Sequence, residues 1–393
     1  MGEYAEGSKE LATKRISRRT FLMGVAGAAG LGVFGGSLAG CAAGTGSGGT
    51  TSTPGTAATG APAANPAVDT VAAKVKGEGR TLRVLMNGGK LSDVIHASVI
   101  EPFEKKYGAN VEVIPSTSAE MMTRVRSEKA NPTIDLVYID DIVAPLGISE
   151  GLFEKIDPSN IPNLKDVDER FVNKDGYGPG GHGVAITFAY NKELVKVDPP
   201  TSWADLWKPD YKDMLAMSSI NLSPAILFLV QAAQLNGGSY DNIDPGFEAI
   251  KRLIPNVRIW WRDTGIIRSN VDKDGVVGIF GQSYWLDEIG KGIPLVPIVP
   301  KEGAHFSAVT LQLVKGSKNK DLAELLINEH LSESGQLGIA RGNYNSIVNK
   351  KVVLPDDLKG KVVSNLNLQY FDPVKIAANR DAWMERWMKD LKV

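Results

Sequence analysis

Two stretches at the start of this chain cannot build a hydrophobic core, and they limit how much of it can fold. Residues 42–77 consist mostly of Gly, Ala, Thr, Ser and Pro. Such a segment buries too little apolar surface to offset its ordering entropy, so we expect a flexible tether. With residues 1–41 set aside as a targeting segment, about 315 of the 393 residues remain. That length exceeds what one hydrophobic core usually holds and predicts two lobes.

The targeting segment begins with paired arginines. Arg18 and Arg19 follow a basic stretch and precede an apolar run that extends to Leu38. A charged region followed by an apolar region indicates an export signal, and the paired arginines resemble the twin-arginine type. Six glycines lower the hydrophobicity of the run, which argues against a membrane-spanning helix.

Cys41 closes the same segment. Leu38-Ala39-Gly40-Cys41 resembles a bacterial lipobox, in which the cysteine is lipidated and becomes the new N-terminus. Cys41 is the only cysteine, so the chain has no intramolecular disulfide and no second thiol for metal binding or catalysis. We therefore expect an exported protein, extracytoplasmic or periplasmic, that a lipid on Cys41 anchors to the outer face of the cytoplasmic membrane.

The charged residues of the chain argue against a nucleic-acid partner. Lysine and arginine together number 44 and aspartate and glutamate 45, and the two signs are interspersed. A nucleic-acid surface would need a clustered basic stripe, so no nucleic-acid partner is expected.

Strand and helix patterns alternate along the folded body. Strands are predicted at 82–86, 111–114, 134–139, 184–190, 214–217, 257–261, 276–280, 295–299 and 308–314. Helices are predicted after Thr117, Ser202, Ser223 and Asp244 and over 321–331 and 373–392; Gly178–Gly183 is interpreted as a turn. This alternation predicts an α/β fold with mostly parallel sheets.

Six motifs then occur in an order typical of one family. They are Phe103–Gly108, Asp135–Val137, Tyr190–Lys192, Thr201–Trp207, Val299–Ala304 and Lys318-Asn319. Together they resemble the extracellular solute-binding proteins of ABC importers of the spermidine/putrescine and ferric-iron type, over roughly residues 81–393. The resemblance implies a type II periplasmic-binding-protein fold: two lobes, each a mostly parallel sheet flanked by helices, with the ligand cleft between them.

The same resemblance implies the organisation and the partners. Residues 78–187 and 303–343 form lobe 1, and residues 188–302 and 344–393 form lobe 2 with a C-terminal helix. The implied partners are a small-molecule solute and the permease and ATPase subunits of the importer. A monomer without a cofactor is expected.

Two stretches bear on the solute. Polyamine receptors of this family carry acids at positions that match Ser218–Ser223 and His305–Ala308, and both stretches are free of acids here. Serines at the start of a helix favour an anion instead, because helix N–H groups bind negative charge. We therefore expect a small organic solute with an anionic group, while the pair Asp140-Asp141 leaves a zwitterion open.

The candidate ligand-binding residues follow strands or lie in family-like loops. They are Asn87, Asp140, Asp141, Ser219, Ser223, Gln282, Ser283, Phe306, Arg341 and Tyr344.

Two alternatives remain beside this interpretation. Within the family, the ligand is a polyamine or ferric iron, although iron-binding members often have adjacent tyrosines and none occur here. Outside it, the chain is an exported, lipid-anchored enzyme. No metal-binding histidine pair and no Gly-x-Ser-x-Gly motif occurs, so no catalytic residue and no metal ligand is assigned.

Overall fold

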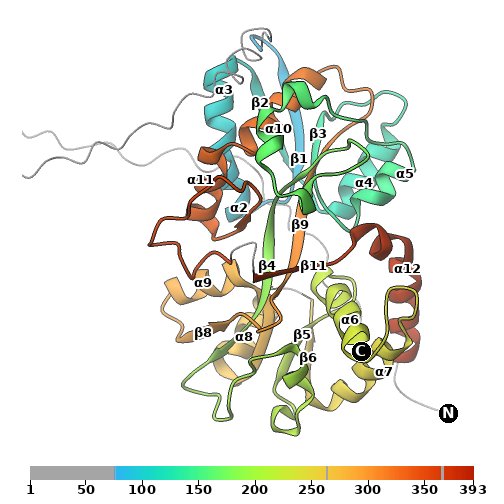
Figure 1. Cartoon of the computed structure of the whole chain (residues 1–393), viewed down its shortest axis with the longest axis vertical. Helices are drawn as coiled ribbons and strands as arrows, with labels where there is room; N and C mark the ends of the chain where they lie inside the picture. The colour runs from blue at the N-terminus through green and yellow to red at the C-terminus, as the bar shows by residue number, and fades with distance from the viewer. Residues whose placement is uncertain (1–74, 76, 263, 364–366) are drawn as a thin grey trace, which may run out of the picture. The chain divides into compact units, whose positions relative to one another are not determined.

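The computed structural model describes residues 75, 77–262, 264–363 and 367–393 (Figure 1). The predicted export signal with Arg18 and Arg19, the lipobox with Cys41 and nearly all of the predicted tether lie outside the described residues. These three features therefore stay predictions.

The described strands form one mixed sheet. In chain order they are β1 Thr81–Met86, β2 Asn110–Pro115, β3 Leu136–Asp140, β4 Gly180–Asn191, β5 Leu215–Ser218, β6 Val257–Trp261, β7 Val277–Gly281, β8 Leu295–Ile298, β9 Ala304–Leu313, β10 Ser346–Ile347 and β11 Leu368–Tyr370. The order across the sheet is β2-β1-β3-β9-β4-β7-β5-β6, with β8 and β10 on β4 and β11 on β9.

Helices flank this sheet on both sides. The longer ones are α4 Ser118–Ser127, α6 Ser223–Leu235, α7 Asp244–Leu253, α8 Thr264–Lys273, α9 Gln282–Gly290, α10 Lys320–His330, α11 Glu333–Asn343 and α12 Pro373–Asp390. The shorter α-helices are α2 Lys90–Ile95, α3 Glu101–Tyr107 and α5 Ala144–Ser149, with the π-helical turn η1 His96–Ile100 between α2 and α3. The 3₁₀ turns are η2 Pro158–Asn160, η3 Pro162–Asp166, η4 Glu169–Phe171, η5 Trp203–Trp207, η6 Pro209–Tyr211 and η7 Ile254–Asn256.

Two parallel groups of strands define two lobes. In the first lobe β1 pairs in parallel with β2 and β3, and in the second lobe β5 pairs in parallel with β6 and β7. The long strands β4 and β9 are antiparallel to each other and pass between the lobes (Figure 1). The predicted two-lobed α/β architecture is therefore confirmed, and its antiparallel pairs lie where the chain crosses.

Each lobe has its own core. Strands β1 and β3 pack with η1, α3 and α10 on one face of the first lobe and with α4 on the other. In the second lobe, β5 and β7 pack with α6, α7 and α12, and β6 packs with α8 and α9. Two elements of the C-terminal part of the chain lie in different surroundings. Strand β10 pairs with β4 at His182 and Gly183, whereas Trp383 and Trp387 of α12 belong to the second-lobe core.

Local sequence signals are confirmed at several helix starts. Thr117 and Glu120 form the predicted capping box of α4, and Ser202 and Asp205 form a second one ahead of η5. The start of α6 differs by one residue, because Leu222 is the N-cap and Ser223 is the first helical residue.

The interpretation of Gly178–Gly183 as a turn is wrong. Strand β4 begins at Gly180, and β9 begins at Ala304, four residues before the predicted start. The glycines permit close packing: a Cβ on Gly183 would lie 2.1 Å from the Phe306 ring. A glycine-rich stretch is a typical turn signal, but it also occurs where a side chain must approach the backbone closely.

Two of the six motifs, Thr201–Trp207 and Val299–Ala304, contact each other. The indole Nε1 of Trp203 donates to the carbonyl oxygen of Gly303 at 3.0 Å, and its backbone N–H donates to Glu302 at 3.3 Å. The Ser202 hydroxyl also donates to the Glu302 carboxylate. His305 stacks on Trp203 with ring centroids 3.7 Å apart. These motifs fix the entry of β9 against η5, which is a structural role.

Candidate functional site

Polar residues follow the parallel strands of both lobes. Asn87 follows β1, Asp140 ends β3, Ser219 follows β5 and Gln282 follows β7. In open α/β sheets ligands bind beyond the carboxyl ends of the strands. We therefore take these strand ends as the candidate solute site.

An ion pair joins helices of the two lobes near these strand ends. Lys90, the first residue of α2, lies 2.7 Å from the carboxylate of Asp287 in α9. Asn87 lies three residues before the start of α2, and Gln282 and Ser283 begin the first turn of α9. The pair thus connects the helix that follows Asn87 with the helix that begins at Gln282.

The second lobe contributes neutral polar groups. Ser219 is buried and its backbone N–H donates to the Trp261 carbonyl at 2.9 Å. The buried Gln282 accepts a hydrogen bond from the Thr187 hydroxyl of β4 at 3.0 Å, which fixes the orientation of its amide. Ser223 and Ser283 lie in the first turns of α6 and α9, where backbone N–H groups have no partner within the helix.

The first lobe contributes the acid pair. Burial raises the pKa of Asp140, while the hydrogen bond with Ser118 and the charge of Arg380 lower it. Arg380 belongs to α12, so this attraction reaches from the second lobe to the end of β3. Burial, followed by the charge of Asp140, raises the pKa of Asp141 to about 8, against the lowering effect of a hydrogen bond with Tyr370.

A cavity of about 820 Å³ lies beside Asp141. Helix α5, residues 169–175, strand β9 and the junction between β11 and α12 form its walls. Its volume is within the range of small-molecule sites. Of the ten candidate residues, Asp141 is the one that lines it.

Three candidates lie in other surroundings. Phe306 is 1% exposed and packs against Phe171 and Tyr370 in the first-lobe core, so the structure places it in the core instead of at an open surface. Arg341 is exposed in the last turn of α11 and pairs with Asp357 at 3.6 Å. Tyr344 caps α11 in the left-handed conformation with φ 54°.

Sequence reasoning missed two residues near the acid pair. Arg380 lies in α12 with the buried Ile376, Trp383 and Trp387, and its charge acts on Asp140. An arginine within an otherwise apolar stripe is the signal that could have identified it. Tyr370 ends β11 and interacts with the Asp141 carboxyl; as one isolated tyrosine it gave no signal.

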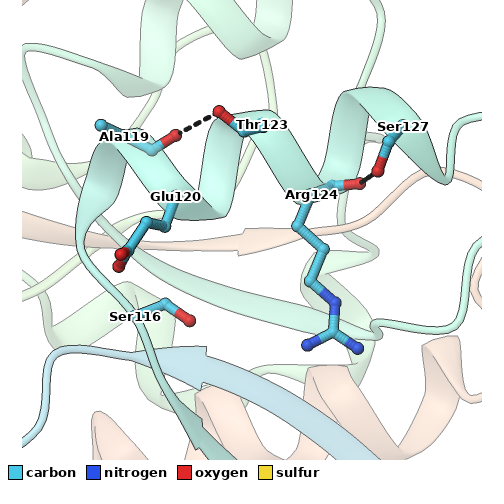
Figure 2. A pocket seen from close by; sticks show the side chains of 6 residues that line it. All are labelled: Ser116, Ala119, Glu120, Thr123, Arg124 and Ser127. Atoms are coloured by element: carbon cyan, nitrogen blue, oxygen red, sulfur yellow. Dashed lines mark hydrogen bonds between the residues drawn. The ribbon is translucent and has the colours of Figure 1, made fainter. Parts of the chain in front are cut away.

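A second, shallower groove of about 420 Å³ follows α4, lined by Ser116, Ala119, Glu120, Thr123, Arg124 and Ser127 (Figure 2). Its polar groups have local partners: the Thr123 hydroxyl donates to the Ala119 carbonyl at 2.9 Å and the Ser127 hydroxyl to the Arg124 carbonyl at 2.8 Å (Figure 2). The Glu120 carboxylate belongs to the capping box. This groove therefore offers no group that a ligand would complete.

Within the described part of the chain, no group of three or more His, Cys, Asp or Glu side chains is placed to hold a metal ion. His182 and His330 meet in the first-lobe core, with Nδ1 and Nε2 3.2 Å apart. Among the same residues, no helix has the length and apolar character needed to cross a membrane.

Comparison with known proteins decides the family. The family model described as bacterial extracellular solute-binding protein matches residues 131–373, more than half of the chain. The chain belongs to this family. The predicted solute-binding function is thereby confirmed, and the relatives of this solute-binding protein act in transport.

Individual relatives support this family assignment. The chain is 27% identical over 248 residues to a spermidine/putrescine-binding periplasmic protein of Salmonella typhimurium, covering 60% of this chain and 70% of the relative. It is 23% identical to a gamma-aminobutyric acid-binding protein of Pseudomonas aeruginosa, over 65% of this chain and 73% of the relative. The crystal structure of an ABC transporter protein from Clostridium perfringens matches with a TM-score of 0.68 and 26% identity, over 78% of this chain and 99% of that one.

Proposed function

We propose that this solute-binding protein is a lipid-anchored, monomeric receptor that closes its two lobes around a small organic solute bearing an anionic group. It then delivers the solute to the permease and ATPase subunits of an ABC importer. The family membership supports the receptor role. The Leu38–Cys41 motif supports the anchor.

The chemistry of the second lobe supports an anionic group. Ser219, Ser223, Gln282 and Ser283 bring hydroxyl and amide groups to the first turns of α6 and α9 or just before them. Helix N-termini favour negative charge, and no carboxylate occurs in Ser218–Ser223 to oppose it. This acid-free start of α6 is the observation that carries the proposed solute class.

A zwitterionic solute has a group of the right charge for the polar residues of each lobe. Asp140 at the end of β3 offers a carboxylate to an ammonium group, while the second lobe holds the anionic end. A relative that binds gamma-aminobutyric acid, which is a zwitterion, is consistent with this arrangement.

A polyamine is the second candidate, because a relative binds spermidine and putrescine. Against it, a polyamine would place an ammonium group beside the stretch Ser218–Ser223, which contains no acid, and an unpaired buried charge costs several kcal/mol.

A thermal-shift panel of amino acids, organic acids, phosphonates, polyamines and ferric salts discriminates between these solutes. A ligand at a hundred times its Kd adds about 2.7 kcal/mol to stability. An organic acid or zwitterion should raise the melting temperature, and Ser219→Ala should reduce that shift while the exposed Lys301→Ala should not. A shift with spermidine or putrescine alone would contradict the proposed solute class. Turnover of any compound would favour the exported enzyme.

A further inference from the structure

A buried carboxylate oxygen of Asp141, which lines the cavity, lacks a hydrogen-bond partner among the described residues. Inside the cavity, the Gln312 side chain exchanges two hydrogen bonds with Gly178, at 3.2 and 3.0 Å. The Thr310 hydroxyl donates to the Ile139 carbonyl at 3.0 Å. Asp141 is 4% exposed, and its Oδ1 has no hydrogen-bond partner among the described residues. A buried acceptor without a donor costs about 1–3 kcal/mol, more when charged.

The charges around the cavity favour a cation. Its lining includes the carboxyls of Asp141, Glu169, Asp175 and Asp372. Lys174 and Arg170 are its basic residues, and Arg170 already makes two hydrogen bonds to Asp168, at 3.0 and 2.8 Å. Phe171 and Tyr370 add aromatic rings, which attract a cation through their faces.

This cavity lies apart from the strand-end groups of the second lobe. Its lining comes from α5, residues 169–175, β9 and the start of α12, and includes none of Ser219, Ser223, Gln282 or Ser283. Its volume of about 820 Å³ far exceeds the ~30 Å³ that one water occupies in the liquid. It therefore has room for an organic molecule.

We propose that this cavity is a second binding site, which takes a small organic amine with its ammonium group on the Asp141 carboxylate. The amine supplies the N–H donors that Oδ1 lacks, and its carbon skeleton contacts Phe171 and Tyr370. Because the bound molecule touches both α5 of the first lobe and the start of α12, it also links segments from both sides of the hinge.

The affinity of this cavity for an amine should depend on pH. Burial and the neighbouring Asp140 raise the pKa of Asp141 to about 8, so the carboxyl is mostly protonated at pH 7. An ammonium group must displace that proton, so affinity should rise between pH 6 and pH 9. The other charged groups near Asp141 are Asp140, Glu169, Arg170, Lys174, Asp175 and Asp372, with Tyr370 and, through Asp140, Arg380.

Saturation-transfer NMR on the full chain tests the site with 2-phenylethylamine and its neutral match 2-phenylethanol. At pH 9, where the Asp141 carboxyl is mostly ionised, the amine should bind about tenfold or more tightly than the alcohol, because a hydrogen bond to a charged group contributes about 1.5–3 kcal/mol. Asp141→Asn should reduce amine binding by a similar factor, and Asp357→Asn, outside the cavity, should leave it unchanged.

Two further variants keep the test decisive. Val374 lines the cavity and is 60% exposed, so Val374→Trp should narrow the cavity and weaken amine binding without disturbing the core. Ser219→Ala should leave amine binding unchanged, which separates this site from the proposed solute site. Equal binding of amine and alcohol, no binding of the amine at millimolar concentration, or binding that survives both Asp141→Asn and Val374→Trp would overturn the proposal.

Discussion

Glu302 is the residue on which the two family motifs meet, and its role is stability. Its carboxylate accepts hydrogen bonds from the Ser202 hydroxyl and from the backbone N–H of Trp203. Hydrogen bonds to a charged group contribute about 1.5–3 kcal/mol. Glu302→Ala should lower the free energy of unfolding by about that amount in urea denaturation. The neighbouring exposed Lys301→Ala should change it by about 0.5 kcal/mol or less, and equal values for both variants would contradict this role.

Asp141 makes stability depend on pH. Its folded pKa of about 8 lies above the ordinary aspartate value of 3.8, so the folded state binds more protons between these values. The stability that the protonated carboxyl contributes is complete below pH ~4 and is lost as pH rises through 8. Asp141→Asn cannot ionise, so it should flatten the fall in unfolding free energy between pH 5 and pH 9, by about 1.4 kcal/mol for each pKa unit removed. Identical pH profiles for the variant and the wild type would refute this assignment.

Individual site residues were only partly predictable. Ser219 and Gln282 could be placed at strand ends, because periodic strands and helix-start signals bracket them in the sequence. The direction of the Phe306 side chain could not be predicted. Whether this side chain faces the core or the cleft depends on the register of β9 against β11. Arg380 acts on Asp140 from 240 positions away in the chain, and no local pattern encodes that approach.

At the scale of elements, the start of β4 depends on glycines that admit a neighbouring ring. A Cβ at Gly183 would lie 2.1 Å from Phe306, in a strand that pairs with both β9 and β10. Gly183→Ala should therefore destabilise the protein by about 1–3 kcal/mol through overpacking. Gly290→Ala at the end of α9, where a Cβ would meet no atom within 4 Å, is the matched control and should not destabilise. Comparable losses at both positions, measured by urea denaturation, would argue against overpacking.

Most strands and the helices with clear start signals could be predicted, since capping boxes and apolar periodicity are local signals, whereas helices such as α8 and α11 were not predicted. The capped starts of α4 and η5 follow directly from Thr117-x-x-Glu120 and Ser202-x-x-Asp205. The early part of β4 was missed because Gly180–Gly183 consists of three glycines and His182, none of which favours a strand, and its pairing with β9 overrides this weak local propensity. The crossing of these strands between the lobes is likewise a tertiary property.

At the scale of the whole molecule, the first prediction concerns attachment. Cys41 ends the lipobox-like motif, and a lipid there would hold the body at a membrane. Cys41→Ala should move the protein from the membrane fraction to the soluble fraction of fractionated cells. The substitution Ser47→Ala in the predicted tether should leave membrane attachment unchanged. Retention of the Cys41→Ala protein on membranes would contradict the lipid anchor.

Capture of a solute between two lobes is the central claim, and small-angle X-ray scattering tests it most directly. Strands β4 and β9 connect the lobes, and hinge closure around ligand is the motion described for periplasmic binding proteins. With the solute that raises the melting temperature present in excess, the radius of gyration of the wild-type protein should decrease, and Ser219→Ala should require more solute for the same decrease. Superimposable scattering profiles with and without a saturating solute would contradict the account.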